Sequence, residues 1–154
     1  MIKHAIIFLA ATAAFAAPVA AGPAEDATAA VTAWLDKFNA GDVNAFKAAH
    51  APNPVIVDEF APHLWTGADA PQRWLDDYGR EAAAGGITGG RLDYAAPIRA
   101  SASGTTAYIV LPTIYRMRQG GKAKSAAGDM TFVMTKVGND WKIASWTYSA
   151  PAPQ

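Results

Sequence analysis

The order of the hydrophobic patterns is the feature of this sequence that most restricts its fold. Within residues 26–81 the apolar side chains recur in three segments at the spacing of one helix face, whereas from residue 91 onward they alternate as in strands. Helices that precede a run of strands joined by short turns are typical of an α+β domain. We therefore expect three N-terminal helices packed on one face of a curved antiparallel sheet.

Capping and breaking residues mark the predicted helix boundaries. The first helix is predicted over residues 26–39, and its apolar face consists of Val31, Trp34, Leu35 and Phe38. Gly41 is suited to the end of this helix, and Asp42 can accept hydrogen bonds from the first free N–H groups of the next. A second helix is predicted over residues 43–50, before a proline-rich segment, and a third follows Asp69.

The strand predictions rest on period-two alternation bounded by glycine-containing turns. A short strand is predicted at residues 55–58, and the segment that follows it is irregular or a brief hairpin arm. Long strands are predicted at residues 91–100, 105–119, 129–137 and 141–149. The Gly138-Asn139-Asp140 turn between the last two is the strongest hairpin signal in the chain.

The N-terminus has the features of an exported protein. Lys3 precedes an apolar segment at residues 5–17, and small residues follow up to Ala21, so residues 1–21 are predicted to be a signal peptide. An uncleaved anchor is the alternative, but the apolar segment is shorter than the ~20 residues that span a bilayer. We expect a periplasmic or secreted protein with one domain at residues 22–154 and no membrane association after cleavage.

The overall composition excludes several classes of protein and site. The chain has no cysteine, so neither a disulfide nor a thiolate nucleophile is available. Lys and Arg number 13, as do Asp and Glu, and this balance argues against nucleic acid as a partner.

Two motifs give the chain a resemblance to a known family. The sequence FNAGD at residues 38–42 ends the first predicted helix, and WKIASWTYS at residues 141–149 forms the last predicted strand. With a strand that ends in an acid between them, these motifs resemble the nuclear transport factor 2-like superfamily, in its SnoaL-like and ketosteroid-isomerase-related branch. The resemblance covers residues 26–149. It implies a cystatin-like, cone-shaped roll with one apolar pocket, and a homodimer formed through the outer sheet face.

Asp58 is the candidate catalytic base. Because strand side chains alternate, Asp58 is predicted to share the face of Ile56 and Phe60, while Glu59 points the other way and is solvated. Burial among apolar groups would raise the pKa of Asp58 toward the value that a general base needs. The alternative is that Asp58 is hydrogen-bonded at a turn or exposed.

The resemblance adds a comparison with the ketosteroid isomerases. It places Asp58 at the position of the family's general base. The position of the family's oxyanion-hole tyrosine falls on Trp34, and no acid occupies the position of the second donor. Steroid isomerisation is therefore not expected.

Histidines and aromatic residues complete the candidate site. His63 is predicted to act as an acid, base or ligand donor near Asp58, or else to be a solvent-exposed loop residue. His50 and His63 lack a metal-binding spacing, so we expect neither a metal nor a cofactor. We expect Trp74 and Phe38 to fill the core. A pocket lining is predicted for Trp34, Trp65, Tyr78, Tyr115, Trp146 and Tyr148.

Three functions remain open from the sequence. The first is an exported binding protein that holds a small apolar or aromatic molecule without turnover. The second is a cofactor-independent isomerase, dehydratase or hydrolase in which Asp58 is the base and His63 with Tyr115 or Tyr148 are donors. The third is a dimeric accessory module whose outer sheet meets a partner through Arg116, Arg118 and Lys136.

Overall fold

The computed structural model describes residues 22–150, so the predicted signal peptide and the last four residues lie outside the described part. The helices are α1 (Pro23–Asn39), α2 (Val43–Ala48) and α3 (Ala70–Ala84). The strands are β1 (His50–Val57), β2 (Leu64–Thr66), β3 (Ile87–Tyr94), β4 (Arg99–Ser103), β5 (Thr106–Gln119), β6 (Lys122–Val137) and β7 (Asp140–Ser149).

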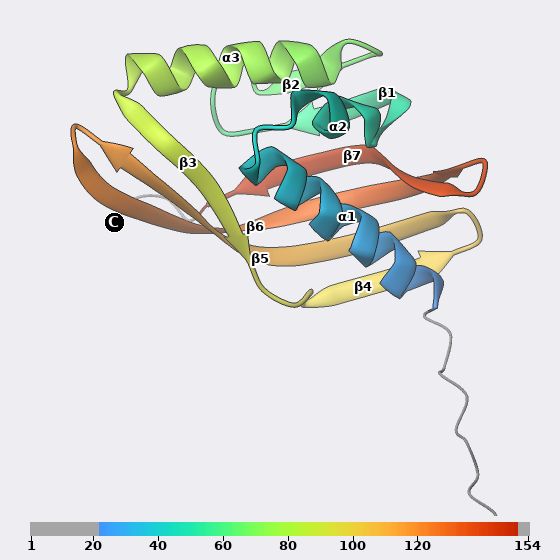
Figure 1. Cartoon of the computed structure of the whole chain (residues 1–154). Helices are drawn as coiled ribbons and strands as arrows, with labels where there is room; N and C mark the ends of the chain where they lie inside the picture. Colours follow the sequence, from blue (N-terminus) through green and yellow to red (C-terminus); the bar gives the residue numbers. More distant parts are fainter. Residues whose placement is uncertain (1–21, 151–154) are drawn as a thin grey trace, which may run out of the picture.

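The strands form one curved sheet with the helices on its inner face (Figure 1). The strand order is β2-β1-β7-β6-β5-β3, and β4 also pairs with β5. This arrangement confirms the predicted α+β fold. All neighbouring strands are antiparallel except β1 and β7, which run parallel. The prediction of a fully antiparallel sheet is wrong at this pair, because no tight hairpin connects β1 to β7 and dictates their direction.

Two strand boundaries differ from the prediction, because the residue pattern along a strand does not show which other strand it pairs with. The strand predicted at residues 91–100 is divided into β3 and β4, with Pro97 in the interval, and proline cannot donate to a ladder. The turn between the next two strands was predicted to span residues 119–128. In the structure it consists only of Gly120 and Gly121, which have φ values of 57° and 78°. Strand β6 begins at Lys122, where its polar side chains are held in register by pairing with β5.

The strand β1 is also longer than predicted. It begins at His50, where the second helix was expected to end, and continues to Val57. Its register against β7 shifts between His50 and Val55, the interval that contains two prolines. Asp58 therefore follows the strand directly instead of ending it, and the predicted hairpin arm is β2.

The core lies between α1 and the inner face of β5, β6 and β7. Alternate residues of these strands are fully buried, as the period of a strand requires. The fully buried large side chains of this layer are Ile109, Leu111, Met130, Phe132, Met134 and Ile143. They pack with Val31, Trp34 and Leu35 of α1, three of the four residues of the predicted apolar face.

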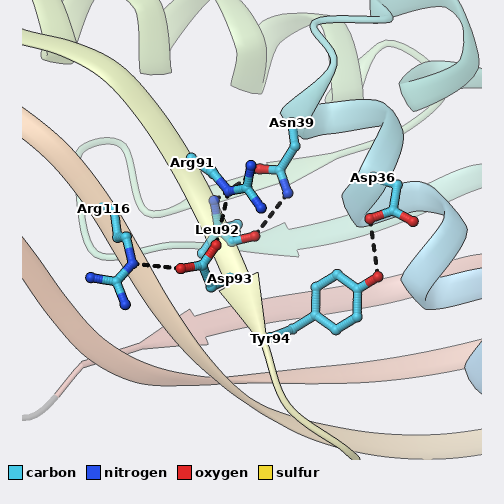
Figure 2. A network of polar contacts seen from close by, with 7 residues as sticks. All are labelled: Asp36, Asn39, Arg91, Leu92, Asp93, Tyr94 and Arg116. Carbon is cyan, nitrogen blue, oxygen red and sulfur yellow. Dashed lines mark hydrogen bonds and ion pairs between the residues drawn. The ribbon is translucent and has the colours of Figure 1, made fainter.

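Asn39 attaches the C-terminal end of α1 to the edge strand β3 (Figure 2). Its Nδ2 donates to the carbonyl of Leu92 at 2.8 Å, and its Oδ1 accepts from the N–H of Leu92 at 2.9 Å. The side chain thus pairs with both backbone groups that β3 presents at its open edge. Nearby, the Tyr94 hydroxyl donates to Asp36 at 3.0 Å, a second link between α1 and β3.

A pair of tyrosines attaches α3 to the other end of β3 and β5. The hydroxyl oxygens of Tyr78 and Tyr115 are 2.7 Å apart and share a hydrogen bond. They lie directly against Gly90, where an added Cβ would clash with both hydroxyl groups. Gly90 is therefore required for close approach, since its backbone conformation is one that other residues can adopt.

Replacing Asn39 with alanine is expected to lower the free energy of unfolding by about 1–3 kcal/mol, because it leaves the N–H and C=O of Leu92 without partners. Urea denaturation followed by circular dichroism measures the loss. Asn44→Ala is the matched control, since Asn44 is exposed in α2, and it should change stability by less than about 0.5 kcal/mol. Equal effects of the two substitutions would show that Asn39 is no anchor.

Gly90→Ala is expected to lower the free energy of unfolding by about 1–3 kcal/mol, because the new methyl group overpacks the tyrosine pair. The control is Gly79→Ala within α3, where an added Cβ has open space. There the same change should raise stability by about 0.5–1 kcal/mol, since alanine is the better helix former. Thermal denaturation of both variants measures whether each substitution raises or lowers stability. Stabilisation by Gly90→Ala would refute the close approach of the two tyrosines to Gly90.

Candidate functional site

A pocket of about 400 Å³ opens on the inner face of the sheet beneath α1 and α3. Helix α1 contributes Trp34 and Phe38 to its wall, and α3 contributes Trp74 and Tyr78. The remaining aromatic lining residues are Phe60, Tyr115, Trp146 and Tyr148. Apolar walls with a few convergent polar groups are the usual form of a small-molecule site.

A second depression of about 670 Å³ lies on the outer face of the sheet, where β5, β6 and β7 meet. It is larger, but Tyr94 is its only aromatic lining residue, and it contains no buried titratable side chain. The inner pocket has several aromatic lining residues and a buried titratable side chain, so it is the better candidate for a functional site.

Asp58 lies in the wall of the inner pocket, on the face that Ile56 and Phe60 were predicted to share with it. Its Oδ2 accepts a hydrogen bond from Trp74 Nε1 at 3.0 Å, and its Oδ1 accepts from the N–H of Glu59 at 2.7 Å. Burial raises the pKa of Asp58 to about 6, although these two hydrogen bonds oppose the rise. The carboxyl group can therefore change its charge near neutral pH.

The loop from Asp58 to His63 holds this carboxyl group in position. The N–H of Asp58 donates to the carbonyl of His63 at 3.2 Å, and the N–H of His63 donates to the carbonyl of Phe60 at 2.9 Å. His63 is exposed, has a φ of 71°, and places Nδ1 3.2 Å from the backbone carbonyl of Asp58. Its imidazole does not line the pocket, so its structural contribution is to close the loop.

The three tyrosines of the pocket differ in their hydrogen bonding. Tyr78 and Tyr115 bond to each other, and burial is the largest cause of the raised pKa of Tyr78. The hydroxyl of Tyr148 is buried and has no partner within residues 22–150. Burial, followed by the charges of Glu59 and Asp58, raises the pKa of Tyr148 to about 12. The hydroxyl groups of Tyr78 and Tyr148 are therefore protonated at neutral pH.

Trp146 and His50 form a buried pair behind the pocket. Trp146 Nε1 donates to His50 Nε2 at 3.1 Å, and His50 Nδ1 lies 3.0 Å from the carbonyl of Phe46. Because an indole can only donate, Nε2 is the acceptor and Nδ1 carries the proton. Burial lowers the pKa of His50 to about 4, so the ring is neutral. The indole of Trp146 thus lines the pocket while its N–H is engaged elsewhere.

The structure places one aromatic residue differently from the prediction and gives two others a second role. Trp65 is fully buried, contacts Phe60 and donates to Asp77 at 2.7 Å, so it supports the pocket wall without lining it. Trp74 lies in the core as expected and Phe38 packs against it, and both also line the pocket. The spacing of Trp74 and Tyr78 in α3 was the signal for this, since residues four apart share a helix face.

Trp34 lies in the wall as expected, with 2% of its surface exposed. Its Nε1 is buried without a hydrogen-bond partner among the described residues. Glu59, predicted to be solvated, is exposed at the rim, and its carboxylate accepts from the N–H of Ala150. Within residues 22–150 no three His, Asp or Glu side chains are placed to hold a metal ion. No helix in that range is long and apolar enough to cross a membrane.

Comparison with solved structures identifies the fold. A ketosteroid isomerase-like protein from Erwinia carotovora atroseptica aligns with a TM-score of 0.66 at 19% identity, over 84% of this chain and 97% of the other. The CaMKII hub of S. rosetta aligns with a TM-score of 0.67 at 19% identity, over 86% and 100%. An NTF2-like protein with a cystatin-like fold from Novosphingobium aromaticivorans gives 0.66 at 14% identity, over 84% and 82%. At these identities the likeness shows the fold alone.

Comparison with family models identifies the family. No curated protein matches the sequence. The model of the SnoaL-like domain matches residues 27–153, which is nearly the whole of the predicted mature chain. The nuclear transport factor 2-like fold and this match agree with the resemblance seen in the sequence. The chain belongs to the SnoaL-like family.

Proposed function

We propose that this chain is an exported protein that binds a small apolar or aromatic molecule in the inner pocket. The observation that carries the proposal is the aromatic wall of a pocket of about 400 Å³ with one buried carboxyl group. Small-molecule sites of roughly 300–1,000 Å³ bury most of a ligand's surface. A molecule of one or two rings fits this range.

The walls of the pocket are held in place before any ligand arrives. Phe46, Trp74 and Tyr78 stack in a row, with centroid distances of 5.6 Å and 5.2 Å and interplanar angles of 18° and 12°. The Trp74 indole is also held by Asp58, and the Tyr78 hydroxyl by Tyr115. A preformed wall supports binding because little side-chain freedom is lost on association.

The exported location is the part of this proposal that rests on sequence alone. Residues 1–21 have the basic start, apolar segment and small residues of a signal peptide, and they lie outside the described residues. We propose a periplasmic or secreted location on this basis.

Proton transfer by Asp58 is a second candidate function. The observation in its favour is the pKa of about 6, which gives Asp58 the basicity suited to a general base near neutral pH. The protonated hydroxyl group of Tyr148 lies in the same pocket without a partner among the described residues, and it can donate to a developing oxyanion. His63, previously considered as a donor, lies outside the lining.

The homodimer stays a prediction, and the outer face of the sheet is the surface for it. Exposed apolar side chains gather there: Val55, Val57, Tyr108, Ile114 and Val133. The basic residues considered as partner contacts are engaged within the domain. Arg116 bonds to Asp93, Arg118 to the carbonyl of Gly121, and Lys136 to the carbonyl of Asn139. Apolar contact therefore supports a dimer better than these charges support an accessory partner.

Filling the pocket should abolish binding. Ala126 lines the inner pocket, and Ala126→Phe is expected to weaken binding of the neutral fluorescent probe N-phenyl-1-naphthylamine by about tenfold or more, about 1.4 kcal/mol or more. Ala127→Phe is the matched control, because Ala127 is the next residue of β6 and is exposed on the opposite face. A fluorescence titration that detects no probe binding to the unmodified protein would refute the binding proposal.

General-base activity is expected to appear as proton exchange in a bound ketone. In D₂O the protein should accelerate exchange of the α-protons of 2-tetralone, and Asp58→Asn should slow this reaction by about 10²-fold or more. Proton NMR follows the loss of signal, with Asp129→Asn on the outer face as the control. Exchange no faster than in buffer, for a ketone shown to bind, would remove the second candidate.

A further inference from the structure

The charged residues of the inner pocket all have the same sign. Asp58, Glu59 and Glu81 are the charged side chains among the residues that line it, and the lining includes no lysine, arginine or histidine. This imbalance is local, because acidic and basic residues number 13 each in the whole chain. The pocket therefore offers a ligand a negative environment within a neutral protein.

None of these three carboxylates is neutralised by an ion pair within residues 22–150. Asp58 is held by uncharged donors, the Trp74 indole and the N–H of Glu59, and Glu59 by the N–H of Ala150. His63 is the one base among the causes that set the pKa of Asp58, and it is the smallest of the five. A buried carboxylate without a counter-ion gains more than an exposed one from a cation placed beside it.

The aromatic walls add a second, independent attraction for positive charge. The faces of tryptophan and tyrosine rings carry negative charge density and bind ammonium groups within about 6 Å of the ring centre. Trp146 meets Trp74 at 81° and Trp34 at 51°, with centroid distances of 5.0 Å and 5.6 Å, so the three rings form differently oriented walls. These rings pack directly on one another, so a ligand meets only the parts of them that line the pocket.

The Tyr148 hydroxyl supplies a polar contact in the same region. It has no partner within the described residues, and the charges of Glu59 and Asp58 both raise its pKa. Asp58, Glu59 and Tyr148 all line the pocket, so this hydroxyl lies in the same acidic environment. The oxygen of this hydroxyl can accept a hydrogen bond from an N–H of a ligand.

We propose that the pocket recognises a small organic cation, an amine or quaternary ammonium that carries an apolar or aromatic group. The inference rests on the proposed binding function and names its ligand class. The cationic group lies beside Asp58 against the aromatic lining, and the apolar group contacts the rest of the aromatic wall. A carboxylate or phosphate ligand is disfavoured, since it would meet three acids and no base.

The test compares three molecules of similar shape by isothermal titration calorimetry or competition with the fluorescent probe at pH 8. They are benzyltrimethylammonium, its neutral carbon isostere 2,2-dimethylpropylbenzene, and the anion phenylacetate. We expect the cation to bind about tenfold or more tightly than the neutral isostere, and the anion most weakly. In Asp58→Asn the cation should lose most of this advantage, while the affinity of the neutral isostere stays within about twofold.

Matched variants keep the test decisive. Asp129→Asn makes the same chemical change on the outer face and should preserve the preference for the cation. If Asp58→Asn does not fold, Glu81→Gln at the exposed rim replaces it and should reduce the preference by a smaller factor. Equal binding of cation and isostere overturns the inference but leaves the binding function intact, whereas binding of neither overturns both.

The dependence on pH gives a second readout. Above pH 6 Asp58 is ionised and attracts the cation, and below it protonation removes that charge, so the preference should fall as pH decreases through about 6. Glu59 and Glu81 face the same pocket, and His63 lies near Asp58 outside it, so Asp58→Asn is needed to isolate the Asp58 step. A preference that is constant between pH 5 and 8, values chosen to bracket that pKa of about 6, would contradict the assigned role of Asp58.

Discussion

The hydrogen bond from the Trp74 indole to Asp58 is the interaction on which the pocket depends. It joins α3 to the loop after β1, two elements that both contribute to the wall. Without it, a carboxylate in this position would keep only the N–H of Glu59 against the cost of burial. The bond therefore stabilises the ionised form of Asp58 and orients the Trp74 ring at the same time. Trp74 also stacks between Phe46 and Tyr78, so a fixed Trp74 ring restricts the orientation of these two neighbours.

The pocket also requires that both long helices are fixed to the sheet. Asn39 attaches α1 to the open edge of β3, while the tyrosine pair attaches α3 where Gly90 permits close approach. The first attachment lies on β3 (Figure 2), and the second joins Tyr78 of α3 to Tyr115 of β5 beside Gly90 of β3. The two helices are thereby held over neighbouring strands of the sheet, and residues of both helices and of these strands line the pocket.

The sequence predicted which segments form helices and strands, and which of their faces are buried, better than it predicted which strands pair. The helix face with Trp34 and the alternation around Ile109 follow from periodicity, because burial on one side imposes it. The parallel pairing of β1 with β7 and the polar start of β6 left no local pattern, since they depend on which distant strand lies beside them. In the site, alternation placed Asp58 on the pocket face. It did not reveal the Trp74 donor, because that contact joins a helix to a loop and only the fold brings them together.

The two roles proposed for Asp58 make opposite demands on its pKa. A general base needs a pKa near the working pH, which burial provides here by raising the value to about 6. A cation beside the same carboxylate favours its ionised form and lowers the pKa, so it reduces the basicity that proton abstraction requires. A ligand that satisfies the acidic pocket would thus make Asp58 a weaker base. The two functions therefore exclude each other for one ligand, because a cation beside Asp58 removes the basicity that proton abstraction requires.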